Sequence, residues 1–237
     1  CAQAWGPLML ARWSSLAVGA LLCLAETVRV RVLQNGAPVG SAARSLEAKN
    51  WASLCGQVEG LFGQQLWQGE RKDWWFANES GWKLGSWEEV LALPDEEPSL
   101  IAIPAGRLFQ WRPRAVGRRF PVELADRAGV EMETIASSPR IFLIHNLLAE
   151  EEAVGLIERA FERKGENALQ QSGVGFKTVG KRNTQGERTS ASAFDSESPI
   201  AKRVLRRAFE VARVPFQESM ADGLQILRYQ EGQACVA

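Results

Sequence analysis

The last fourteen residues, LQILRYQEGQACVA (Leu224–Ala237), form the stretch on which the fold of the C-terminal half depends. Leu224 to Tyr229 reads as a β-strand, and Gly232 marks a polar turn directly after it. A second extended run then begins and the sequence stops. We therefore expect a strand followed by an unfinished hairpin.

Composition and charge limit the classes of function. The 237 residues are 46% hydrophobic and 24% charged, which is typical of a globular chain with one large or two ordinary domains. The 28 basic and 28 acidic residues leave no net charge, so no nucleic-acid partner is indicated. Four scattered cysteines without a CxxC pair argue against a zinc site or a disulfide scaffold. His145 is the one imidazole available for catalysis or metal binding.

Residues 1–25 predict a targeting segment. Arg12 precedes an apolar run from Leu16 to Leu24, which is the pattern of a secretory signal peptide or a short signal anchor in the membrane; the alternative is a buried N-terminal helix. Asn78-Glu79-Ser80 is a glycosylation sequon, with Asn78 as its acceptor. Both features predict entry into the secretory pathway.

Residues 26–106 predict a small ubiquitin-like β-grasp domain. The strand VRVRV (28–32) is followed by Asn35-Gly36, a strong hairpin signal, and a second strand is expected at Val39–Ala43. Apolar residues then recur at helical spacing up to Phe62, and the apolar strand SLIAIP (99–104) closes the domain.

The tryptophans between the helix and that last strand have two interpretations. Large aromatic side chains fill the core of a small domain, which is the interpretation we favour, although such a cluster can also stack on a ligand. A protein partner of this domain is a further expectation. The five tryptophans are Trp67, Trp74, Trp75, Trp82 and Trp87. Residues 107–138, which include the basic stretch RPRAVGRRF (112–120), are interpreted as a linker.

From Pro139 the sequence predicts an alternation of strands and helices. PRIFLIHNLL (139–148) reads as a strand, and a helix follows from Glu150, with Val154, Ile157 and Phe161 as its buried stripe. Residues 170–187 are polar and indicate a loop or a weak hairpin. A second helix is predicted with Ser198 as N-cap and Pro199 at its first position.

This arrangement resembles the beginning of the prolyl 4-hydroxylase catalytic domain, in the family of iron(II)- and 2-oxoglutarate-dependent dioxygenases. The resemblance spans residues 139–237 and rests on Arg188-Thr189-Ser190, on the spacing from there to Tyr229, and on the string LQ-x-x-x-Y-x-x-G-Q. The family fold is a double-stranded β-helix, or jelly roll, flanked by helices. The expected fold class is therefore α+β: a β-grasp-like N-terminal domain followed by an incomplete double-stranded β-helix in residues 139–237.

The resemblance implies roles for individual residues. Tyr229 matches the family tyrosine whose hydroxyl can donate to the 2-oxoglutarate carboxylate near the metal. Arg188 and Ser190 match a segment that folds over the peptide substrate, and Asp222 matches an acidic substrate-side position. Cys235 stands where relatives often carry a second tyrosine, so that part of the pocket departs from the family pattern.

The resemblance also implies iron(II), 2-oxoglutarate and ascorbate as cofactors, with a proline-containing peptide or protein as substrate. In this family a His-x-Asp pair of iron ligands follows the Tyr229 string almost at once, and its position would lie directly after Ala237. A triad of two histidines and a carboxylate cannot be assembled with His145 alone, so we expect no metal ligand and no catalytic residue within this chain.

The expected function is that of a fragment of a procollagen-proline 4-dioxygenase-like enzyme of the endoplasmic reticulum, inactive by itself. The alternative is a non-catalytic interaction or scaffold protein with a degenerate oxygenase domain.

Overall fold

A computed structural model describes residues 27–63, 73–162, 168–172, 176–178, 181–182 and 190–233. These residues form a mixed α+β structure, so the predicted α+β class is confirmed. The leader at residues 1–25 lies outside the described residues. In chain order the strands and helices are β1 (Val28–Gln34), β2 (Arg44–Ala48), α1 (Trp51–Phe62), β3 (Trp74–Ala77), β4 (Lys83–Leu84), α2 (Trp87–Leu91), β5 (Ser99–Pro104), β6 (Arg119–Pro121), β7 (Glu131–Ser137), β8 (Arg140–His145), α3 (Glu150–Glu162), β9 (Gln170–Gln171), β10 (Phe176–Thr178), β11 (Lys181–Arg182), β12 (Ala191–Asp195), α4 (Pro199–Val211), η3 (Glu218–Met220) and β13 (Leu224–Arg228).

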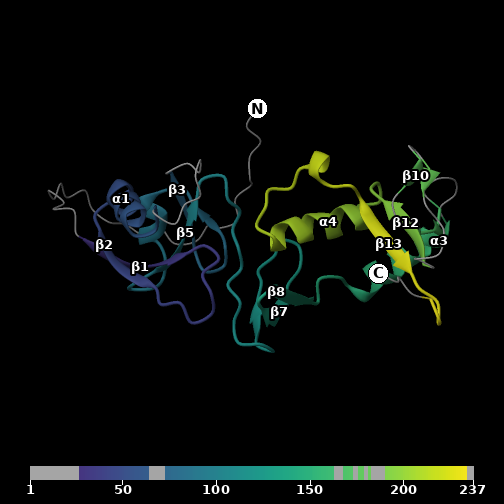
Figure 1. Cartoon of the computed structure of the whole chain (residues 1–237), viewed down its shortest axis with the longest axis horizontal. Coiled ribbons are helices and arrows are strands. Elements are labelled where there is room, and N and C mark those ends of the chain that lie inside the picture. The colour runs from purple at the N-terminus through teal and green to yellow at the C-terminus, as the bar shows by residue number, and fades with distance from the viewer. Residues whose placement is uncertain are drawn as a thin grey trace, which may run out of the picture.

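The N-terminal half is built on a five-stranded sheet in the order β2-β1-β5-β3-β4 (Figure 1). β1 pairs antiparallel with β2 and parallel with β5. Because neighbouring strand residues point to opposite faces, Val32 packs in a core with Leu54 and Val58 of α1, while Leu33 packs on the other face beside Phe109. Both faces of this sheet are therefore covered.

The predicted second strand at Val39–Ala43 is wrong in position, because β2 begins at Arg44. The Asn35-Gly36 turn forms as expected, with Gly36 at φ +73°, a conformation that glycine adopts without strain. A further turn then closes from Pro38 to Ser41 and lengthens the connection. The Asn35 side chain donates a hydrogen bond to the carbonyl of Leu108 and accepts one from the backbone N of Gln110. These two bonds attach the turn to the segment that follows β5.

The tryptophan-rich stretch contributes to the N-terminal core. Trp74 is buried in the cluster beneath α1, and Trp87 packs against the same cluster. Trp75 packs against the cluster on the opposite sheet face. The core interpretation therefore holds for these three tryptophans, whereas Trp82 remains partly exposed and Trp67 lies outside the described residues.

The segment interpreted as a linker, residues 107–138, contains β6 and β7, which form a three-stranded antiparallel sheet with β8. Its own core includes Phe120, Val130 and Met132. The strand pattern was hard to recognise because β6 is only three residues long and places buried Phe120 between exposed Arg119 and Pro121. An irregular linker is therefore the wrong description of residues 119–137.

Arg213, just past the end of α4, joins the two halves of the molecule. Its guanidinium lies 4.1 Å above the Trp82 ring and 5.1 Å from the Trp111 ring. Its Nε donates to the carbonyl of Ser80 at 2.7 Å. The neighbouring contact is a 2.6 Å hydrogen bond from Trp111 Nε1 to the carbonyl of Val211. The N-terminal half is thereby attached to the end of α4.

The C-terminal half contains the sheet β13-β12-β9 and the two helices α3 and α4 (Figure 1). The cap prediction is confirmed: the Ser198 side chain accepts a hydrogen bond from Ala201 N, and α4 begins at Pro199. The polar stretch at 170–187 contains β9 and a short β10–β11 hairpin, in line with the weak-hairpin alternative. Among the described residues, no helix has the length and apolar character needed to cross a membrane.

The predicted buried stripe of α3 is wrong, although α3 begins at Glu150 as expected. Val154, Ile157 and Phe161 are 46%, 53% and 56% exposed. The buried face instead contains Leu156 and Ala160, which follow Glu152 at intervals of four residues. Glu152 on the same face pairs with Arg207 of α4, as described below.

Candidate functional site

Two of the residues that carry the family resemblance, Ser190 and Tyr229, lie at one end of the β12–β13 pair. The two strands are antiparallel, with Ala191 opposite Arg228 and Asp195 opposite Leu224. Ser190 directly precedes β12 and Tyr229 directly follows β13, so the register places both at the same end of the pair. The Tyr229 side chain is 45% exposed there.

Ser190 is a buried contact between strands. Only 1% of the residue is exposed, and its hydroxyl is 3.0 Å from the hydroxyl of Ser172, to which it donates. The carbonyl of Ser190 accepts a 2.7 Å hydrogen bond from Ser172 N. Sequence reasoning missed Ser172, since nothing distinguishes it within a polar, irregular stretch. In this structure the Ser190 hydroxyl fixes the backbone at the end of β12 rather than facing outward.

Asp222 lies at the other end of the β12–β13 pair. It is exposed and sits two residues before Leu224, the residue opposite Asp195. A five-residue strand spans about 15 Å, so the structure does not bring Asp222 together with Tyr229. Arg188 and Cys235 lie outside the described residues.

The end of β12 that faces α4 is fixed by Asp195, whose side chain is fully buried. Its Oδ1 accepts from the backbone N of Ser198 at 3.0 Å, and its Oδ2 accepts from Arg159 Nε at 3.0 Å. Burial would raise the pKa of Asp195, but the hydrogen bonds from Ser198, Glu197 and Arg159 outweigh it and hold that pKa well below its usual range. The strand, the cap of α4 and α3 are thereby held together.

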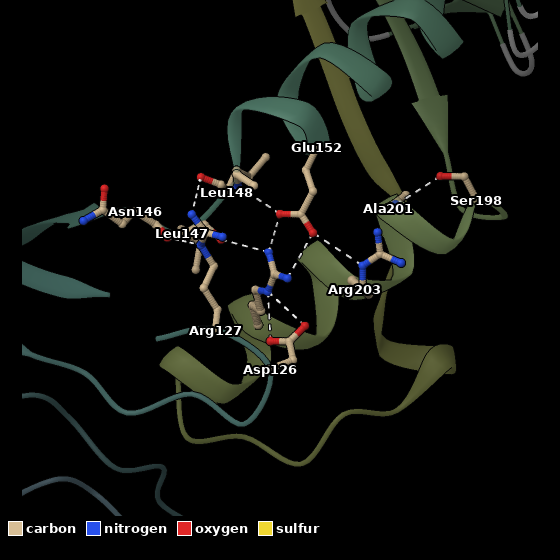
Figure 2. Close-up of polar contacts among 11 residues, drawn as sticks. Asp126, Arg127, Asn146, Leu147, Leu148, Glu152, Ser198, Ala201 and Arg203 are labelled. Atoms are coloured by element: carbon tan, nitrogen blue, oxygen red, sulfur yellow. Dashed lines mark hydrogen bonds and ion pairs between the residues drawn. The ribbon is translucent and has the colours of Figure 1, made fainter. Parts of the chain in front are cut away.

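An ionic network centred on the buried side chains of Arg207 and Glu152 joins α3, α4 and the loop after β6. Figure 2 shows Glu152 of α3, Arg203 of α4 and Asp126 of the loop converging on one place. Arg207 lies between the two carboxylates: Nη1 donates to Glu152 at 2.6 Å and Nε donates to Asp126 at 2.9 Å. It also donates to the carbonyl of Leu147.

The protonation of this network follows from its contacts. The Arg207 hydrogen bonds lower the pKa of Glu152 to about 2, against the opposing effect of burial. Asp126 and Glu152 raise the pKa of Arg207 further above its usual range. Both groups are therefore charged at neutral pH. The network supports α3 and α4 beneath the sheet and has no contact with Tyr229 in the described residues.

Asn78 and His145 occupy well-defined positions outside this region. Asn78 lies in the turn between β3 and β4, partly exposed, and its Oδ1 accepts from Trp82 N at 3.0 Å. His145 ends β8, and its Nε2 lies 2.7 Å from a Glu133 oxygen that also accepts from Arg119. These contacts, His145 first, lower the pKa of Glu133. His145 is thus a partner in a surface cluster.

The described residues do not fit an iron ion. Among them, no group of three histidine, cysteine or acidic side chains is placed to hold a metal. The whole sequence contains one histidine, whereas the iron triad of this dioxygenase class takes two. Comparisons of the chain with protein-family models, curated proteins and solved structures returned no match.

Proposed function

We propose that this chain is the N-terminal part of an iron(II)- and 2-oxoglutarate-dependent dioxygenase of the prolyl 4-hydroxylase type. The observation that carries the proposal is the placement of Ser190 and Tyr229 at one end of the β12–β13 pair. The two residues come from segments far apart in the sequence, and both match positions of the family pattern. A coincidental sequence match would not require them to meet.

The proposal includes a β-grasp fold for the N-terminal half and the beginning of a double-stranded β-helix for the C-terminal half. The order β2-β1-β5-β3-β4, with β1 parallel to β5, supports a β-grasp domain in the N-terminal half. In the C-terminal half, β13 has a partner on one side only among the described residues. This open edge is where further strands of a double-stranded β-helix would pair.

The reaction would couple oxidative decarboxylation of 2-oxoglutarate to hydroxylation of a peptidyl proline, with dioxygen as oxidant and ascorbate as an auxiliary reductant. In it, the Tyr229 hydroxyl would donate a hydrogen bond to the oxoglutarate carboxylate, for which its exposed position is suitable. Ser190 would hold the adjoining strand end in place. Arg188 and Asp222 remain proposed substrate contacts. Iron ligation is assigned to a His-x-Asp pair beyond Ala237.

The proposed location is the endoplasmic reticulum, reached through the leader at residues 1–25 and accompanied by glycosylation of Asn78. The support is the apolar run from Leu16 to Leu24 and the sequon at Asn78. Peptide mapping of the protein recovered from the microsomal fraction of a eukaryotic host, with and without glycosidase treatment, tests both assignments.

The decisive experiment is to read the transcript past the codon for Ala237 and to express the longer chain. We expect a His-x-Asp motif within the next dozen codons and turnover of 2-oxoglutarate that depends on iron and on proline-rich peptides. In that protein Tyr229→Phe should raise the KM for 2-oxoglutarate about tenfold, the effect of one hydrogen bond to a charged group.

A stop codon at that point would instead favour the alternative, a non-catalytic interaction or scaffold protein. The exposed apolar residues Val154, Ile157 and Phe161 on α3 are the observation in its favour, because such surfaces mark contacts between proteins. In that case Tyr229→Phe would leave any partner binding by α3 unchanged.

A further inference from the structure

A cavity of about 350 Å³ lies against the face of the first sheet that α1 does not cover. Leu33 of β1 and Ile101 of β5 form its floor, and Trp111 and Phe120 of the following segment line it from the other side. Trp111 packs against the buried clusters of both the first sheet and the β6-β7-β8 sheet. The cavity is thus at a junction between two cores, a common position for small-molecule sites.

The apolar lining is aromatic and held rigidly. The Trp111 and Phe120 ring centroids are 5.9 Å apart with an angle of 47° between their planes, and Phe109 supports Trp111 edge-on at 5.2 Å. Phe120 is buried, so its ring cannot turn away without opening the core behind it. Trp111 is only partly buried, so part of its ring is open to a ligand, and Phe120 supports it from the buried side.

Three charged residues complete the lining. Arg112 is held in place, since its Nη2 donates to the carbonyl of Ser41 at 2.7 Å. The Arg114 guanidinium lies 4.7 Å above the Phe120 ring, and none of the described carboxylates forms an ion pair with it. Glu79 is the single acidic residue of the lining. The charge balance, two arginines against one glutamate, favours an anion.

We propose that this cavity binds a small organic anion with a flat apolar body, such as an aromatic carboxylate or sulfonate. The body would lie against the partly exposed Trp111 ring and Val39, above the floor of Leu33 and Ile101, and the anionic group would accept hydrogen bonds from Arg114 at the open side. A guanidinium that already stacks on an aromatic ring keeps its donors free for an anion in its own plane. Tyr229 is not among the residues that line the cavity, so this proposal does not depend on the proposed dioxygenase function.

The test uses the whole chain and 8-anilinonaphthalene-1-sulfonate as the probe, titrated by its own fluorescence, with the uncharged N-phenyl-1-naphthylamine as comparator. We expect saturable binding of one sulfonate per chain, and binding of the uncharged compound about tenfold weaker. Arg114→Gln should weaken sulfonate binding about tenfold, whereas Glu79→Gln should tighten it. Arg118→Gln, an exposed arginine of the same segment outside the cavity, is the matched control.

Val39→Trp provides a steric test, because Val39 is a partly exposed residue of the lining and a larger side chain would occupy the cavity. This variant should abolish sulfonate binding while its near-UV circular dichroism stays native. Equal binding of the charged and uncharged probes would overturn the anion assignment. Unsaturable binding, or the same affinity in Arg114→Gln and Arg118→Gln, would overturn the site itself, even if Val39→Trp does not fold.

Discussion

At the scale of single residues, Arg207 pairs with two carboxylates at once. It is buried between Glu152 and Asp126, and it also bonds the backbone of Leu147. A buried guanidinium is tolerated because two carboxylates compensate its lost hydration. Removing Glu152 leaves buried Arg207 with the more exposed Asp126 as its remaining carboxylate partner in the described network, so the network is sensitive to this substitution.

Glu152→Gln should therefore destabilise the chain by about 3 kcal/mol, the typical cost of breaking one side of a buried ion pair. The measurement is urea unfolding at pH 7 followed by far-UV circular dichroism. Glu151→Gln is the matched control, since Glu151 is the exposed neighbour on the same helix. An equal loss of stability in the two variants would contradict the assigned role of Glu152.

Glu152 should also make the free energy of unfolding depend on pH. Because the pKa of Glu152 is lowered from 4.5 to about 2 in the folded protein, its contribution is fully present above pH 4.5. It should be lost progressively as the pH falls from 4.5 towards 2, since the unfolded chain takes up the proton first. Unfolding free energies across this range should fall less steeply in Glu152→Gln than in the parent chain. Parallel curves would show that Glu152 is not the responsible group.

Arg213 has a different role, because its partners belong to both halves of the molecule. It lies between the Trp82 and Trp111 rings, and burial lowers the pKa of its guanidinium. Arg213→Ala should cost about 3 kcal/mol from the lost stacking and hydrogen bonds, and should shift the tryptophan emission. Arg213→Lys should recover only part of this, since an ammonium does not stack as a planar group.

Thermal unfolding followed by tryptophan fluorescence measures this effect, with Arg118→Ala as an exposed control. We expect the single transition of the parent to separate into two in Arg213→Ala, because the halves then unfold independently. A single transition at an unchanged temperature would show that Arg213 does not couple them.

At the scale of elements, helix α3 buries the face that contains Glu152 and its ion pair with Arg207, and not the stripe of larger apolar residues. Leu156 is buried with Ala160, whereas Ile157 is more than half exposed. Leu156→Ala should cost about 3 kcal/mol, and Ile157→Glu less than about 0.5 kcal/mol. Chemical denaturation of the two variants provides the comparison. A larger loss of stability in Ile157→Glu than in Leu156→Ala would instead support the buried stripe predicted from apolar spacing.

The elements that could be predicted from the sequence are those with local signals. Ser198 and Pro199 mark the start of α4 because capping depends on residues within one turn. The orientation of α3 could not be predicted, since it depends on Arg207, which is distant in the sequence. Likewise, nothing near Ser172 indicates its hydrogen bond with Ser190. The features that sequence patterns did not predict are therefore those that involve contacts between segments distant in the sequence.

At the scale of the whole molecule, the sheet of the C-terminal half has an open edge at β13 among the described residues. Leu227 on this strand is exposed, and unpaired edges of this kind promote association between chains. We expect the chain to self-associate with rising concentration in sedimentation velocity, and Leu227→Lys to reduce this. Val116→Lys, an exposed apolar residue in a loop, is the control. Equal effects of the two lysines would indicate a general effect of charge.

The shared position of Trp111 has a consequence for how this molecule can be recombined. Its ring packs against the cluster that contains Phe109 and against the one that contains Phe120, so it contributes to two cores. A chimera of two related sequences joined between residues 107 and 122 would place Trp111 from one parent against core residues from the other. Chimeras that keep the fold should therefore have their join outside this interval, so that Trp111 and the residues around it come from the same parent.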